Sequence, residues 1–267
     1  FMGDSFTEGA SGTYEDSFVG IFEKNSKKKV ANLGVVSYAP KIYLSKLNYL
    51  LERGYEFKHI VVVIDVSDLY DDNVYYRVTE NYTVDENYER GERLKLRKFL
   101  RKNFPFTNFY MFVIKNLNTI GYAPKNINNE KPIFHKDVIT KASWTYSSDD
   151  IIEGYWGSIK DAQQSLIKTM SELHRLLDKN GIPLSIVVYP WPQQLEKDVV
   201  DSKHVVMWKE FCETKCANFI NLFPIFFKEK DNKGFLETYK KYYWWNDMHF
   251  NVEGNKLVAR EISKILK

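Results

Sequence analysis

Apolar runs alternate with amphipathic stretches toward both ends of the chain. Three runs predict strands, Val30–Val36, Ile60–Ile64 and Leu184–Tyr189, and Phe219–Phe223 predicts a weaker one. The run IVVVI at 60–64 is apolar at every position and rich in β-branched residues. That pattern is typical of a strand buried on both faces of a parallel sheet.

Helix signals lie between and after these runs. Pro40 predicts a helix start and Gly54 its end, in keeping with the preference for proline at the first position and glycine after the last. Ser158 and Asp161 have the spacing of a capping box for a long helix ending at 180–181. Asn251 is placed to cap a final helix with an apolar face. Strands separated by helices predict an α/β fold with a parallel sheet covered on both faces.

The stretch 73–155 breaks this rhythm, and we expect a single domain, 1–267, with an insertion there over the carboxyl edge of the sheet. The insertion is polar, then basic, then aromatic. Its basic and aromatic part, 90–117, suits a membrane surface. The alternative, which we prefer, is a lid helix that packs on the domain and leaves a basic face in water.

Charge and cysteine content narrow the function classes. The formal charge of +3, from 38 basic and 35 acidic side chains, is too balanced to indicate a nucleic-acid partner. No apolar run approaches the roughly 20 residues that a membrane helix needs. Cys212 and Cys216, four apart on an expected helix, do not make a disulfide framework and alone make a poor metal site. The five histidines contain no paired metal motif, so we expect neither a metal nor a cofactor.

Two segments carry the strongest candidate chemistry. Ser5 follows Gly3 and Asp4 at an expected strand-to-helix turn, where a serine points its hydroxyl into a site and offers its own N–H to an oxyanion. Asp247 and His249 are two apart, so in extended chain both point into one cleft. Asp247 then holds the imidazole tautomer while the other ring nitrogen takes the serine proton. Each motif alone is more often structural than catalytic.

Two further segments end at the same expected sheet edge. Gly34 closes the first strand and offers a bare backbone N–H, a second oxyanion donor. Ser67 follows the IVVVI strand among four aspartates, Asp65, Asp68, Asp71 and Asp72. The spacing of these carboxylates lacks the glycine and terminal glutamate of a calcium loop, so we interpret them as loop carboxylates and helix caps.

Together, these segments resemble the four sequence blocks of the SGNH (GDSL-like) hydrolase superfamily. GDSFTEG at 3–9 resembles the nucleophile block, and NLGVVSY at 32–38 the glycine block. VVVIDVSD at 61–68 stands where the family has Gly-x-Asn-Asp, and DMHFNVEGN at 247–255 resembles the closing block. The resemblance frames the whole chain in the right order and leaves the insertion uncovered.

The resemblance implies a flavodoxin-like three-layer α/β/α fold. It also implies a catalytic triad of Ser5, His249 and Asp247, with an oxyanion hole from the N–H groups of Ser5 and Gly34. Two departures stand out. Ser67 occupies the place of the usual third donor, an Asn side chain, and one residue rather than two separates the acid from the base. The shorter spacing is similar to that of some polysaccharide O-acetyltransferase relatives.

The sequence therefore predicts a serine esterase that cleaves an O-acyl or O-acetyl ester, on a small molecule or a polysaccharide, through an acyl-enzyme. The alternatives are an O-acetyltransferase acting on a polysaccharide, and a carbohydrate-binding protein of this fold with weak catalysis. Aromatic side chains next to the motifs are candidates to stack on a sugar, with core packing as the competing interpretation: Tyr38, Tyr70, Trp191 and Trp245.

The nucleophile block normally follows a buried strand, and only Phe1 and Met2 precede it here. We therefore expect the natural protein to continue upstream, with any targeting signal outside this sequence. The resemblance favours the cell envelope or the exterior as the compartment.

Overall fold

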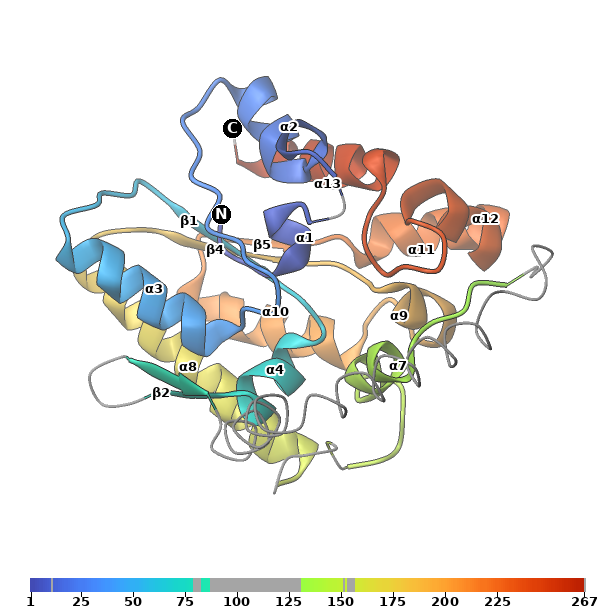
Figure 1. Ribbon diagram of the computed structural model, residues 1–267, viewed down its shortest axis with the longest axis horizontal. Helices are drawn as coiled ribbons and strands as arrows, with labels where there is room; N and C mark the ends of the chain where they lie inside the picture. The colour runs from blue at the N-terminus through green and yellow to red at the C-terminus, as the bar shows by residue number, and fades with distance from the viewer. Residues whose placement is uncertain (11, 79–82, 87–130, 151, 153–156, 267) are drawn as a thin grey trace, which may run out of the picture.

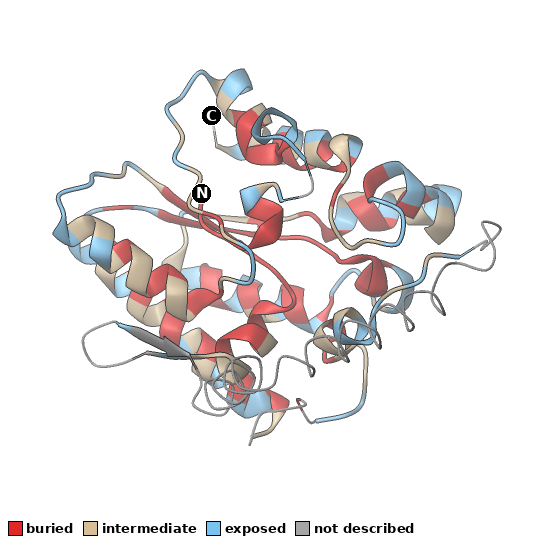
Figure 2. Cartoon of the chain, viewed as in Figure 1, coloured by how far each residue is buried: buried red, intermediate tan, exposed pale blue. Residues whose placement is uncertain are grey.

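A computed structural model describes residues 1–10, 12–78, 83–86, 131–150, 152, 157–266. Its centre is a parallel sheet in the order β1–β4–β5, formed by Ile60–Ile64, Leu184–Val188 and Asn218–Asn221 (Figure 1). In this sheet Val62 pairs with Ile186, and Ile186 in turn pairs with Phe219. All residues of β1 and β4 are buried, as the continuous apolar runs predicted (Figure 2).

The first residues of the chain extend the sheet beyond β1. Met2 forms a parallel bridge with Val62, where the Met2 N–H donates to Val61 at 2.9 Å and the Val63 N–H donates to Met2 at 2.8 Å. On the other side, Phe1 donates to the Ala31 carbonyl and accepts from the Leu33 N–H, at 2.8 Å each. This alternation is the bonding pattern of parallel neighbours. Val30–Val36 is therefore extended beside 1–3, but it is not the regular strand that we predicted.

Helices lie on both sides of the sheet (Figure 1). Two pack together on one side, α2 at Phe18–Ser26 and α13 at Val252–Ile265. On the opposite side are α3 at Pro40–Glu52, α8 at Ile159–Lys179 and α10 at Lys203–Lys215. The predicted caps are present. Ser158 and Asp161 form the capping box of α8, and Asn251 accepts the Gly254 N–H at the start of α13 at 3.0 Å.

Shorter elements surround this frame. They are α1 at Ser5–Glu8, a 3-10 turn at Tyr14–Asp16, α4 at Asp68–Val74, α7 at Lys136–Ser143, α9 at Pro192–Lys197, α11 at Phe223–Lys233 and α12 at Phe235–Tyr242. A separate antiparallel pair joins β2 at Tyr76–Val78 to β3 at Val84–Glu86. Most of the expected insertion, including all of 90–117, lies outside the described residues. Among those described, no helix combines the length and apolar character needed to cross a membrane.

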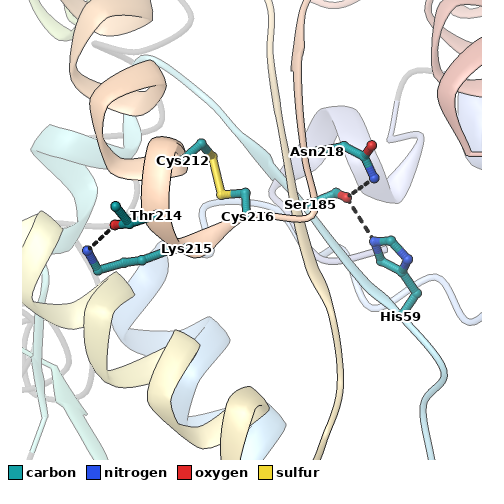
Figure 3. The surroundings of a disulfide bond; sticks show 7 residues. All are labelled: His59, Ser185, Cys212, Thr214, Lys215, Cys216 and Asn218. Atoms are coloured by element: carbon teal, nitrogen blue, oxygen red, sulfur yellow. Dashed lines mark hydrogen bonds between the residues drawn. A yellow bond between two sulfur atoms is a disulfide. The ribbon is translucent and has the colours of Figure 1, made fainter.

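The two cysteines form a disulfide at the junction between α10 and β5 (Figure 3). Cys212 lies in the last turns of α10, and Cys216 is the residue that ends it. The bridge spans only four positions, so it closes a short loop and constrains the unfolded chain little. Near the disulfide, the Ser185 hydroxyl at the start of β4 hydrogen-bonds with His59 Nε2 at 2.8 Å (Figure 3). It also accepts a hydrogen bond from Asn218 Nδ2, at the start of β5, at 3.0 Å.

Candidate active site

Ser5 is the first residue of α1 and follows the short sheet segment 1–3 after one residue, Asp4. The Asp4 side chain caps this helix by accepting the Phe6 N–H at 3.0 Å. Ser5 is 7% exposed, and within the described part of the chain its own N–H donates no hydrogen bond. The turn thus presents a hydroxyl and a free N–H together, as the sequence predicted for a nucleophile position.

The structure brings His249 to Ser5 from the opposite end of the chain. The Ser5 Oγ atom lies 2.8 Å from His249 Nε2, and His249 Nδ1 lies 2.7 Å from Asp247 Oδ1. The Phe6 ring packs on the imidazole with centroids 4.6 Å apart. An ionised Asp247 places the ring proton on Nδ1, so Nε2 is left to accept the serine proton.

A tight loop between α12 and α13 holds the acid and the base. The Trp244 N–H donates to the His249 carbonyl at 3.0 Å, and the Asp247 N–H donates to the Trp244 carbonyl at 3.1 Å. Asn246 adopts a positive φ of 59°, a conformation that asparagine tolerates well. Hydrogen bonding from the His249 side chain is the main cause that lowers the pKa of Asp247 below its usual value. Asp247 is therefore ionised at neutral pH and can stabilise an imidazolium.

The other two expected oxyanion donors already have acceptors. The Gly34 N–H donates to Asn32 Oδ1 at 3.0 Å, and the Ser67 hydroxyl donates to Asp71 Oδ2 at 3.2 Å. Ser5 alone offers a donor without a described acceptor. An oxyanion at Gly34 would have to displace the Asn32 side chain, whose Nδ2 also donates to the Thr7 carbonyl at 2.7 Å. Sequence reasoning missed this role of Asn32, which lies two residues before the glycine.

Gly34 has a clear packing role as well. A Cβ atom built there would lie 2.6 Å from the Glu8 backbone nitrogen and 2.8 Å from the Thr7 backbone carbon. Only glycine lets this segment run so close to α1. The glycine therefore sets the distance between the extended segment and the helix that begins at Ser5.

The four aromatic candidates divide by exposure. Trp191 is 1% exposed, and its Nε1 donates to Asp65 Oδ2 at 2.6 Å. A ring this buried offers no face to a sugar, which favours core packing, the competing interpretation, for Trp191. Trp245 is 43% exposed and stands two residues before Asp247, so it remains a candidate.

Tyr38 and Tyr70 are each partly buried and lie beside a lysine. Lys46 Nζ stands 5.3 Å from the Tyr38 ring centre, and Lys141 Nζ stands 5.5 Å from that of Tyr70. Tyr70 lines a separate hollow between α4 and α7, together with Trp144 and Ile152. The structure does not bring Tyr70 to the hollow beside Ser5.

A small hollow, half open to solvent, lies next to Ser5 and His249. Small side chains of the loop after α1 form one wall, and aromatic rings next to the serine and histidine form the other. The lining includes Gly9, Ala10, Gly12, Thr13, Phe6 and Phe250. A hollow of this kind accepts a compact, mainly apolar group at the serine.

The aspartates near Ser67 are buried rather than exposed in a loop. Asp65, Asp68, Asp71 and Asp72 are each at most 2% exposed. Asp68 is the first residue of α4 and accepts the Asp65 N–H, which precedes the helix, at 3.0 Å; no described side chain at the start of α4 accepts a first-turn N–H, so the predicted capping role is wrong. Their burial was not foreseen, because a run with four acids in eight residues indicates a solvated loop. Among the described residues, no group of three or more histidine, cysteine or acidic side chains is arranged to hold a metal ion.

Comparisons with protein-family models, curated proteins and solved structures return no match to this chain.

Proposed function

We propose that the protein is a serine esterase of the SGNH type, which cleaves a small O-acyl ester through an acyl-enzyme. The observation that carries the proposal is the continuous chain from Ser5 Oγ to His249 Nε2, at 2.8 Å, and from His249 Nδ1 to Asp247, at 2.7 Å. A serine, a base and an orienting acid in this order form the arrangement that activates a hydroxyl nucleophile.

The path of the chain through the sheet supports the family. Numbered by their order in sequence, the segments 1–3, 31–35, β1, β4 and β5 lie side by side in the order 2-1-3-4-5. That order is the one of flavodoxin-like folds, whose ligands bind at the carboxyl ends of the strands. Ser5 comes two residues after the end of segment 1–3, so its hydroxyl lies at that edge.

In the proposed reaction, Ser5 Oγ attacks the acyl carbonyl while His249 Nε2 takes the hydroxyl proton. The oxyanion accepts a hydrogen bond from the Ser5 N–H. It also accepts one from the Gly34 N–H after the Asn32 side chain has moved away from that group. His249 then gives the proton to the leaving alcohol, and a water molecule, deprotonated in turn by His249, releases the acid.

The hollow beside Ser5 supports a short acyl group. Most of the residues that line the hollow are small, and Ser5 itself is one of them. We expect p-nitrophenyl acetate to be cleaved faster than the butyrate, and the octanoate to be cleaved most slowly. A rate that rises with chain length would contradict an acetyl-sized acyl site.

One observation favours the weak-catalyst alternative, a carbohydrate-binding protein that keeps this fold. Two of the three expected oxyanion donors are hydrogen-bonded within the protein. Loss of one such donor costs about 2.7–4 kcal/mol of transition-state stabilisation in a protease. The exposed Trp245 next to Asp247 is the side chain that would contact the sugar, or the acceptor of a transferase.

Labelling with a fluorophosphonate separates the esterase from the weak-catalyst alternative. We expect stoichiometric labelling that peptide mapping places at Ser5, and loss of both labelling and p-nitrophenyl acetate turnover in Ser5→Ala. Ser263→Ala is the matched control, because the Ser263 hydroxyl only bonds the Ala259 carbonyl within α13. Equal turnover in Ser5→Ala and the wild type would remove Ser5 from the mechanism.

A further inference from the structure

A group of buried carboxyls lies directly behind the candidate nucleophile. Asp4 is 5% exposed and its Oδ2 atom lies 3.4 Å from Ser5 Oγ. The carboxyl group of Asp65, which is 1% exposed, lies within hydrogen-bonding reach of Asp4. Two buried carboxyl groups in hydrogen-bonding contact repel each other strongly when both are ionised, so one proton is shared between them.

The hydrogen bonds around the pair indicate which group is the anion. Asp65 accepts from Trp191 Nε1 at 2.6 Å, from the Tyr189 hydroxyl at 3.0 Å and from the Ser67 N–H. Among the described residues, the Phe6 N–H is the donor to Asp4, and Asp4 Oδ2 lies 3.4 Å from Ser5 Oγ, whose one proton faces His249. Donors stabilise a carboxylate, so the negative charge belongs on Asp65 and the proton on Asp4.

We propose that Asp4 is a neutral carboxylic acid, hydrogen-bonded to the Asp65 carboxylate, and that it keeps negative charge away from the back of Ser5. Burial and the neighbouring Asp65 charge both raise the pKa of Asp4 well above its usual value, while the Phe6 N–H lowers it. The assignment of the proton does not depend on the proposed function. Its consequence for catalysis rests on the proposed function.

The consequence follows from where charge develops in the reaction. The tetrahedral intermediate carries negative charge beside Ser5, and an ionised Asp4 only 3.4 Å away would oppose it. Asp4 also caps α1 and so fixes Ser5 opposite His249. Asp4 is in this sense a positioning residue, and activity falls as the pH rises far enough to remove its proton.

Several other ionisable groups surround Asp4 and affect its charge. They are Asp65, Asp68 and Asp71, the phenols of Tyr43 and Tyr189, His249 beyond Ser5, and Lys141, which pairs with Asp71 at 2.6 Å. Burial raises the pKa of both phenols well above the usual value, so they stay neutral across the range in which Asp4 titrates. Asp68, which interacts with both members of the pair, also has a pKa raised well above its usual value, mainly by burial.

Infrared difference spectroscopy tests the proton itself and needs no turnover. The wild type minus Asp4→Asn at neutral pH should show the carbonyl band of a protonated carboxylic acid. Asn at this position keeps the shape of the neutral acid and can donate to Asp65 through its amide. A carboxylate band in that difference spectrum would overturn the proposal, whatever the protein catalyses.

The pH–rate profile for p-nitrophenyl acetate tests the catalytic consequence. We expect the wild-type kcat to decline at alkaline pH and Asp4→Asn to lack that decline. Asp4→Ala should lose at least about tenfold in kcat at every pH, the effect of one ordinary hydrogen bond in the transition state. Superimposable profiles of wild type and Asp4→Asn would overturn this part.

Asp72→Asn is the matched control for the loss of a buried acid. Asp72 is 0% exposed, but it faces Lys41 rather than the nucleophile. We expect this variant to keep the alkaline decline. If Ser5→Ala turned over substrate as fast as the wild type, the proposed function would fail while the infrared result on Asp4 still stood.

Discussion

At the scale of single residues, the acid of the proposed triad is its most exposed member. The Asp247 side chain is 41% exposed and that of His249 only 15%. Water screens a partly exposed charge, so in the proposed mechanism Asp247 acts mainly by orienting the imidazole through one short hydrogen bond. The His135–Asp137 pair has the same two-residue spacing, but it is 75% and 78% exposed and separated by 3.4 Å. Spacing alone therefore does not distinguish the two pairs, whereas burial and the contact with Ser5 do.

This comparison predicts the effect of neutralising each acid. Asp247→Asn should lower kcat for p-nitrophenyl acetate by about 10²–10⁴-fold, because an amide no longer fixes the tautomer that accepts the serine proton. Asp137→Asn should leave kcat within about twofold, as expected for an exposed pair. Steady-state kinetics on both purified variants measure this. Equal losses in the two would show that the pairing of Asp247 with His249 has no special role.

At the scale of elements, the site depends on how closely the segment 30–36 approaches α1. Gly34→Ala places a methyl group against the backbone of Thr7 and Glu8, at 2.6–2.8 Å, where no flexible side chain can move aside. We expect a loss of about 1–3 kcal/mol in the free energy of unfolding, the usual effect of overpacking. Urea unfolding of Gly34→Ala measures it.

Gly12→Ala is the control for that loss, because a Cβ atom at Gly12 meets no atom within 4 Å. Its free energy of unfolding should stay equal or rise slightly, since alanine restricts the unfolded chain. A Gly34→Ala variant as stable as Gly12→Ala would mean that the segment can move away from α1 at little cost.

The elements also show what the sequence could and could not predict. The apolar runs at 60–64 and 184–188 predicted β1 and β4, because burial on both faces leaves a continuous signal. The acidic run DLYDDNV predicted no helix, yet it forms α4. Its carboxylates are satisfied by partners distant in sequence, such as Lys141 for Asp71 and Lys41 for Asp72, and no local pattern reveals those.

Within the site, the order of the motifs was enough to predict that Ser5, Asp247 and His249 meet. Their catalytic roles stay a prediction. The hydrogen bonds that occupy Gly34 and Ser67 could not be read from the sequence, because they depend on where Asn32 and Asp71 lie in three dimensions. The burial of Trp191 could not be read from the sequence either, because its Nε1 donates to Asp65, a residue far away in the chain.

At the scale of the whole molecule, the buried carboxyls link the site to stability. Desolvation raises the pKa of Asp4, Asp68 and Asp71, and it raises that of Asp72 to about 6 despite Lys41. An acid whose pKa is raised by folding contributes fully below its unfolded pKa of about 4, and the contribution is lost as the pH rises through the folded pKa. Buried His204, whose pKa is lowered to about 3, has the opposite slope, but only below about pH 6.5.

Asp68→Asn isolates one of these acids. Asp68 accepts the Asp65 N–H and the Tyr43 hydroxyl, and an asparagine oxygen can keep one of these bonds without bringing a charge. At pH 5 the aspartic acid is protonated, so the wild type should equal or exceed the variant in free energy of unfolding. As the pH rises toward 9, Asp68 is ionised in the unfolded chain. In the folded wild type it must either ionise while buried or stay protonated at a pH where the unfolded chain releases the proton. The free energy of unfolding of the wild type, relative to the variant, then falls by about 1.4 kcal/mol per pH unit. The fall continues until the pH reaches the raised pKa of the folded protein. Urea unfolding of both proteins at pH 5, 7 and 9 measures the difference, in which the slopes from His204 and every unchanged group cancel.

A difference that stays constant over this range would mean that Asp68 has the same pKa in the folded and the unfolded chain. The Asp68 carboxyl group would then be solvated rather than buried.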